Sequence, residues 1–77
     1  MTTYEIVQDI IVQKLGVECC DVKPESLLDD DLLADSLDAI EIALALEEEF
    51  NIALTEEAVG SWSTVQDIVD SVDRERG

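Results

Sequence analysis

Ser36 is the residue of this chain best placed for covalent chemistry, yet the sequence gives it no partner that could activate it. It follows Asp35 at the start of a strongly helical segment, where free backbone N–H groups favour a phosphate. A serine nucleophile needs a base, and the 77-residue chain contains no histidine. Another protein must therefore perform any chemistry at Ser36, unless this residue serves only to cap the helix.

Two other groups of reactive side chains give weaker patterns. Asp30 and Glu41 stand at the first and twelfth positions of a calcium loop, but apolar residues occupy its third and fifth positions. Cys19 and Cys20 are adjacent, so they can bridge only through a strained ring, and no histidine can complete a zinc site with them. We therefore expect no dedicated metal site, no disulfide framework and a reduced, cytoplasmic setting.

The charge selects the kind of partner. Twenty Asp and Glu against four Lys and Arg give a formal net charge of −16. Such a surface repels nucleic acid and anionic membranes, so we expect a basic protein partner, no nucleic acid and no stable membrane binding. Leu, Ile, Val and Phe make up 25 of the 77 residues, which is enough apolar material for the chain to fold.

Apolar residues recur every three or four positions, which predicts an all-α fold, a small four-helix bundle with a long first loop and a short third helix. Segments 3–15, 35–50 and 64–74 carry this spacing, and a short helix is expected at 55–59. No internal repeat or linker interrupts the chain, so 1–77 is interpreted as one domain.

Capping residues mark the ends of these helices. The capping-box spacing predicts that Thr2 with Glu5 opens the first helix and that Ser63 with Gln66 opens the last. Gly16 stands where the first helix should stop.

The connection after Gly16 is long and needs anchoring to the helices. Pro24 could open a single helical turn within it. The apolar residues expected to anchor it are Val17, Val22, Leu27, Leu28 and Leu32.

The central helix carries two apolar arcs, and a small bundle cannot easily bury both. The first arc, expected to face the core, consists of Ala39, Ile42, Ala43, Leu46 and Phe50. The second arc consists of Leu37, Ile40 and Leu44 and is flanked by Glu41, Glu47 and Glu48. An apolar stripe with carboxylates along its edges is typical of a docking surface. The alternative is that the long loop folds back over the second arc and buries it.

The segment that begins Asp35-Ser36-Leu37-Asp38 and ends Glu47-Glu48-Glu49-Phe50 resembles the acyl carrier protein family. The resemblance extends over nearly the whole chain, through Leu15-Gly16-Val17, Thr64-Val65-Gln66-Asp67, the acidic balance and the length. In that family Asp-Ser-Leu opens the second of four helices, and the serine carries 4′-phosphopantetheine. The resemblance implies a carrier rather than an enzyme, with the arm attached at Ser36 from coenzyme A by a phosphopantetheinyl transferase.

The resemblance also implies partners and surfaces. The arm would hold acyl groups as thioesters, and the monomeric domain would deliver them to acyltransferases, ketosynthases and reductases of fatty-acid or polyketide biosynthesis. The implied docking positions are Asp35, Leu37, Asp38, Ile40, Glu41, Leu44, Glu47 and Glu48. The implied walls of an acyl cleft between the helices are Leu28, Leu46, Leu54, Val59, Trp62 and Ile68.

Two positions depart from the family pattern and indicate a specialised carrier. Leu33 stands where the family usually has a glycine, which implies an ordinary loop conformation that exposes Leu33 to a particular partner. Trp62 replaces a smaller aliphatic residue and would shorten the acyl chain that fits the cleft. Two rival interpretations stay open: an acidic interaction module that mimics an anionic ligand and carries no arm, and a related aminoacyl or peptidyl carrier.

Overall fold

Helices form most of the chain in the computed structural model, which describes residues 2–32 and 35–76 and, for Ser36, only the backbone. The helices are α1 (Thr3–Leu15), α2 (Ser36–Phe50), the short α3 (Glu56–Gly60) and α4 (Val65–Arg76). Within those residues the only β pairing is one isolated antiparallel bridge between Leu27 and Thr64. The expected all-α fold with a long first loop and a short third helix is thereby confirmed.

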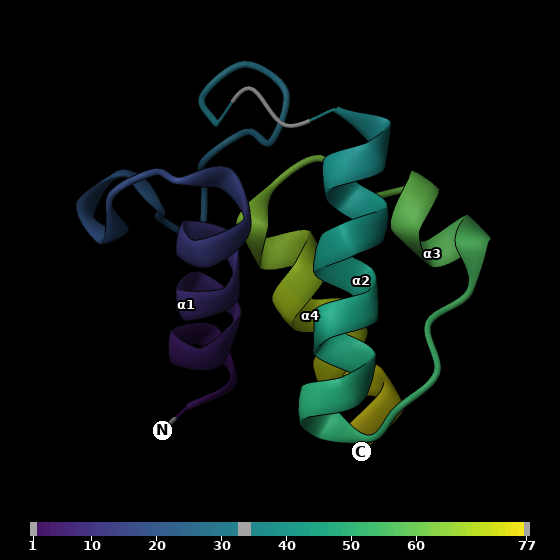
Figure 1. Ribbon diagram of the computed structural model, residues 1–77. Coiled ribbons are helices and arrows are strands. Elements are labelled where there is room, and N and C mark those ends of the chain that lie inside the picture. The colour runs from purple at the N-terminus through teal and green to yellow at the C-terminus, as the bar shows by residue number, and fades with distance from the viewer. Residues whose placement is uncertain (1, 33–34, 77) are drawn as a thin grey trace.

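The helices pack as a small bundle (Figure 1). α1 and α2 run in opposite directions, and α3 lies beside the first half of α2. α1 packs against both α2 and α4, whereas α3 contacts α2. Both chain termini lie at the end of the molecule opposite the start of α2 (Figure 1). None of the helices in the described part of the chain has the length and apolar character needed to span a bilayer.

α1 begins and ends as the capping pattern predicts. The side chains and backbones of Thr2 and Glu5 form the reciprocal capping box. Gly16 closes the helix with φ 69°, a left-handed conformation that a residue with a Cβ adopts only at a cost.

The start of α4 was predicted one residue too early. Thr64, not Ser63, precedes the helix, and its Oγ1 accepts from the backbone N–H of Asp67 at 3.3 Å. The Oδ2 atom of Asp67 accepts in return from the N–H groups of Thr64 at 3.0 Å and Ser63 at 2.8 Å. Bonds to a carboxylate are stronger than bonds to a neutral amide, and Gln66 instead donates to Asp70.

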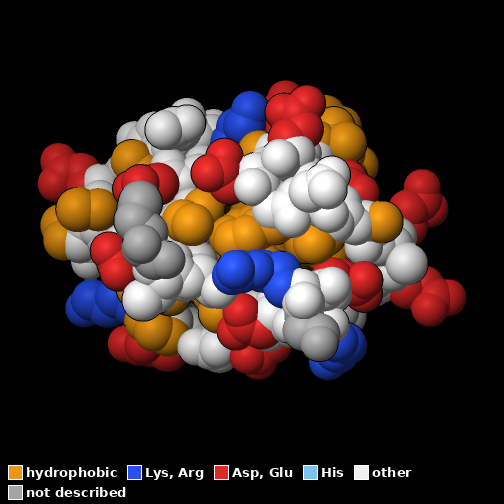
Figure 2. Space-filling view, turned by 90° about the horizontal axis from the view of Figure 1, so that it is seen from below, with side chains coloured by type: hydrophobic (Ala, Val, Ile, Leu, Met, Phe, Trp, Pro, Cys, Tyr) orange, Lys and Arg blue, Asp and Glu red, His pale blue; other side chains and the backbone are white. Residues whose placement is uncertain are grey.

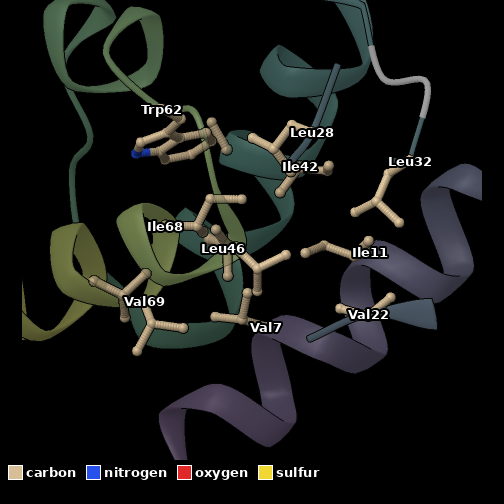
Figure 3. Packing of buried hydrophobic residues seen from close by; sticks show 13 residues of the cluster. Val7, Ile11, Val22, Leu28, Leu32, Ile42, Leu46, Trp62, Ile68 and Val69 are labelled. Carbon is tan, nitrogen blue, oxygen red and sulfur yellow. The ribbon is translucent and has the colours of Figure 1, made fainter. Parts of the chain in front are cut away.

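The core forms from one face of each long helix together with the loop (Figure 3). On α2 the predicted core arc is confirmed, because Ile42, Ala43 and Leu46 are buried and Ala39 and Phe50 pack against them. The loop contributes four of its five expected anchors, since Val22, Leu28 and Leu32 are buried and Val17 packs against the core, whereas Leu27 is 40% exposed.

The long loop makes its one helical turn at Cys19–Asp21 rather than at Pro24. The hydroxyl of buried Ser26 explains the difference, since it accepts from the N–H of Lys23 at 3.0 Å and donates to the carbonyl of Asp21 at 3.1 Å. These bonds stabilise a turn in place of a helix. The turn of Leu33 and Ala34, where the family glycine is replaced, lies outside the described residues.

The end of the molecule where the termini lie has basic side chains on its surface. Figure 2 shows Lys and Arg side chains there beside hydrophobic surface, with acidic side chains around the periphery. The guanidinium carbon of Arg76 lies 5.0 Å from the centroid of the Phe50 ring, and Arg76 also donates to Thr3 Oγ1 at 2.9 Å. These contacts fasten the last turn of α4 to α2 and to the start of α1.

Candidate functional site

The first turn of α2 is fixed by two carboxylates that bind backbone. Asp35 Oδ1 accepts from the N–H of Asp38 at 3.0 Å, and Asp38 Oδ2 accepts from the N–H of Asp35 at 3.2 Å. Asp35 is therefore the cap, and Ser36 is the first helical residue. The alternative in which Ser36 itself caps the helix is wrong, because the Asp35 side chain occupies that role.

The stripe of Leu37, Ile40 and Leu44 is a surface feature. These side chains are 71%, 49% and 57% exposed, in that order, and Glu41 and Glu48 beside them are exposed as well. The described part of the long loop does not cover the stripe, since about half or more of each of the stripe's side chains is exposed, whereas Leu28 and Leu32 of the loop are buried in the core. The alternative of a buried second arc is therefore wrong.

Glu47 is one of the implied docking residues whose carboxylate binds backbone within the chain. It is only half-buried, and its Oε2 atom accepts from the backbone N–H of Leu54 at 3.1 Å. This bond ties the connection between α2 and α3 back onto α2. Asp38 is also half-buried and engaged in the helix cap. Both carboxylates thus have a structural partner within the chain.

A cavity of about 680 Å³ lies along α2, where it meets α3 and the long loop. It reaches from Asp35, next to Ser36 in the chain, to Glu47, which is about 18 Å further along the helix at 1.5 Å per residue. Its volume falls in the range of small-molecule binding sites. A molecule attached at the start of α2 would therefore begin at one end of the cavity.

The structure brings together four of the six residues expected around a cleft. Leu28, Leu54, Val59 and Trp62 line the cavity. Leu46 and Ile68 do not line it, because both are fully buried in the core cluster. Leu46 is enclosed by the core cluster and is 0% exposed, whereas its neighbours on the same arc, Ile42 and Ala43, also reach the cavity.

Sequence reasoning missed the wall that α2 itself provides. Ala39 and Ala43, one turn apart, line the cavity, as does Gly60 at the end of α3. Small residues at this spacing leave room between two helices, and that was the available signal. Ile40 and Leu44 also line the cavity, so they belong both to it and to the exposed stripe.

The cavity has apolar walls and acidic edges. The carboxylates among its lining residues are Asp29, Asp35, Glu47 and Glu56, and the described lining contains no Lys or Arg. Trp62 is the one aromatic residue in the described lining, and its indole N–H donates to Ser71 Oγ on α4 at 2.9 Å.

The fold and the site together define a carrier domain, a helical bundle in which one helix starts at a serine and has an exposed apolar stripe and a cavity along it. Residues 5–72 match the family described as Phosphopantetheine attachment site. The acyl carrier protein of Helicobacter hepaticus is 45% identical over 69 residues, which cover 90% of this chain and 91% of that protein.

The solved structure of the acyl carrier protein from Enterococcus faecalis matches with a TM-score of 0.74 at 29% identity. The match covers 97% of this chain and 99% of that one. The chain belongs to the acyl carrier protein family. It is a carrier and not an enzyme, and its prosthetic group is 4′-phosphopantetheine, which a phosphopantetheinyl transferase installs.

The start of α2 fits this prosthetic group. The positive end of a helix stabilises a phosphate, and Asp35 and Asp38, which would oppose it, already accept backbone hydrogen bonds there. The group supplies a terminal thiol that holds an acyl chain as a thioester. The exposed apolar stripe and the cavity both lie along the helix that begins there.

Proposed function

We propose that Ser36 carries the 4′-phosphopantetheine arm and that residues 1–77 act as one monomeric carrier domain for acyl thioesters. The observation that supports this most strongly is the position of Ser36 as the first residue of α2, after a cap made by Asp35. The cavity that begins at Asp35 supports the same assignment.

The acyl groups are passed to enzymes of fatty-acid or polyketide biosynthesis, namely acyltransferases, ketosynthases and reductases with basic docking surfaces. Exposed Leu37, Ile40 and Leu44 support this, because an apolar stripe supplies affinity once a partner covers it. Glu41 and Glu48 supply charge that steers a basic partner and orients it. The net charge of −16 argues against nucleic acid and stable membrane binding.

The cavity shelters part of the acyl chain. Its apolar walls, which include Leu28, Leu54, Val59 and Trp62, favour hydrocarbon over water. The free and exposed Cys19 and Cys20 are consistent with a reduced, cytoplasmic setting for this chemistry.

Mass spectrometry of the intact protein tests the attachment. The chain is incubated with coenzyme A, Mg²⁺ and a phosphopantetheinyl transferase of broad specificity. We expect the mass of one phosphopantetheine group to be added to the wild type and to a Ser61→Ala control, and none to Ser36→Ala. Ser61 is an exposed serine after α3, so this control removes a hydroxyl and keeps Ser36.

Two outcomes would contradict the proposal. An unmodified wild type would favour an acidic interaction module without an arm. A modified chain that accepts amino acids from an adenylating enzyme but no fatty acyl group would favour an aminoacyl or peptidyl carrier.

A further inference from the structure

We propose that Trp62, held in place by Ser71, forms the end wall of the cavity and limits the length of the acyl chain that the carrier can shelter. This inference rests on the proposed function, because it concerns the chain carried on the arm at Ser36. Trp62 would then be a residue that determines specificity, set where the cavity meets the core.

Trp62 closes the cavity against the core. The residue is only 9% exposed, and it lines the cavity together with Leu28 and Ile42. In Figure 3 the ring lies beside Leu28 and Ile42, with Ile68 and Leu46 beyond it in the cluster. Ile68 and Leu46 are fully buried, so the side chains behind the ring leave no room for a chain to continue.

Hydrogen bonds fix both the ring and the backbone of Trp62. Its indole N–H donates to Ser71 Oγ at 2.9 Å, and the backbone N–H of Trp62 donates to the carbonyl of Val59 at 3.3 Å. A buried indole N–H left without an acceptor is costly, so the bond to Ser71 fixes the orientation of the ring. In Figure 3 the indole nitrogen points away from Leu28 and Ile42. The ring therefore presents hydrocarbon to the cavity.

The carboxylates that line the cavity disfavour a negatively charged acyl group. Asp29, Asp35, Glu47 and Glu56 all line it, and a carboxylate on the acyl group, as in malonyl, would meet these negative charges. A neutral hydrocarbon chain meets the apolar walls without this repulsion. The geometry thus points to neutral acyl chains as the sheltered substrates, with Trp62 limiting their length.

Thermal unfolding of loaded protein tests the length limit. Butyryl, octanoyl and palmitoyl groups are attached to the arm through amide bonds that do not hydrolyse, and Tm is measured by circular dichroism. Each methylene that enters the cavity raises Tm by at most about 3–6 °C, since its burial stabilises only the folded state. We expect Tm to rise from butyryl to octanoyl in the wild type and no further with palmitoyl.

Variants then show whether Trp62 sets this limit. In Trp62→Leu the rise should continue to palmitoyl, because the end wall has been removed. Ser71→Ala keeps the ring but removes the acceptor of its N–H, so palmitoyl should raise Tm slightly above the octanoyl value. The Ser61→Ala control should give the same Tm with octanoyl and palmitoyl, as in the wild type. A continued rise to palmitoyl in the wild type, or an unchanged plateau in Trp62→Leu, would overturn the inference.

Fluorescence keeps the inference testable if Trp62→Leu does not fold. Trp62 is the only tryptophan, so its emission reports on this cavity alone. Octanoyl loading should protect Trp62 from acrylamide quenching, compared with protein whose arm has no acyl group. Unchanged quenching would show that the acyl chain does not contact the ring. Failure of Ser36 to accept the arm would instead refute the proposed function, so the two failures are distinguishable.

Discussion

Two leucines on α2 provide a direct comparison between core and docking surface. Leu46 is 0% exposed and Leu44 is 57% exposed, although they lie two residues apart on the same helix. Replacing each by alanine removes the same atoms and favours helix formation to the same small extent. Any difference in effect between Leu46→Ala and Leu44→Ala therefore arises from the surroundings of the two side chains.

The expected magnitudes are far apart. Leu46→Ala removes buried methyl groups and leaves a void, which costs about 3 kcal/mol of unfolding free energy, with a range of about 2.7–5 kcal/mol. A chain of 77 residues has a total stability of about 4–12 kcal/mol, so this loss is a large fraction of it. Tm should fall by about 12–24 °C. Leu44→Ala should change stability by no more than about 0.5 kcal/mol.

Urea unfolding measures both variants, followed by circular dichroism and by the fluorescence of Trp62. Coincident transitions from the two probes would show that the unfolding is two-state. Leu44→Ala should instead slow modification by the phosphopantetheinyl transferase, with kcat/KM reduced about fivefold or more if the leucine anchors the partner. A Leu44→Ala variant as unstable as Leu46→Ala, or one modified at the wild-type rate, would refute the assignment of the stripe.

Two further predictions concern charge. Hydrogen bonds from Ser63 and Thr64 hold the pKa of Asp67 below its usual value, so its stabilising effect is present above the unfolded-state pKa and is lost as pH falls through the folded-state pKa. Asp67→Ala should therefore cost about 1 kcal/mol in urea unfolding near neutral pH. An equal cost at a pH below the folded-state pKa, where the carboxyl is protonated, would contradict the role of the charge. Glu41→Lys should slow modification by the transferase without unfolding the domain, and the loss should shrink at high salt. Glu75→Lys makes the same charge change at an exposed position of α4. An equally slow modification of this variant would show that only the net charge matters.

Local signals sufficed for most of the helices. The Thr2 and Glu5 box, the left-handed Gly16 and the cap at Thr55 involve neighbours in sequence, so spacing alone located them. The start of α4 was missed by one residue because Ser63 and Thr64 are both good caps. Only the bonds from both residues to Asp67 decide between them.

The residues that line the cavity are determined by tertiary packing, which the sequence pattern does not reveal. Helical periodicity identified the exposed stripe, because the angular positions of Leu37, Ile40 and Leu44 follow from the helix alone. Which apolar residues line the cavity depends on how α3 and the loop lie against α2. For this reason Leu46 and Ile68 were expected in the wall, although both belong to the core.

α2 contributes to the core, to the exposed stripe and to the cavity, because its helical periodicity points successive side chains in different directions. Leu46 faces the core, Leu37 faces solvent, and Ile40 and Leu44 are exposed and also line the cavity. A partner that covers Ile40 and Leu44 therefore touches the same side chains as an acyl chain in the cavity. The carboxylate of Glu47 holds the connection to α3 at the far end of this wall, at 3.1 Å from the N–H of Leu54. The surface proposed to receive a partner and the wall of the cavity thus share side chains of a single helix.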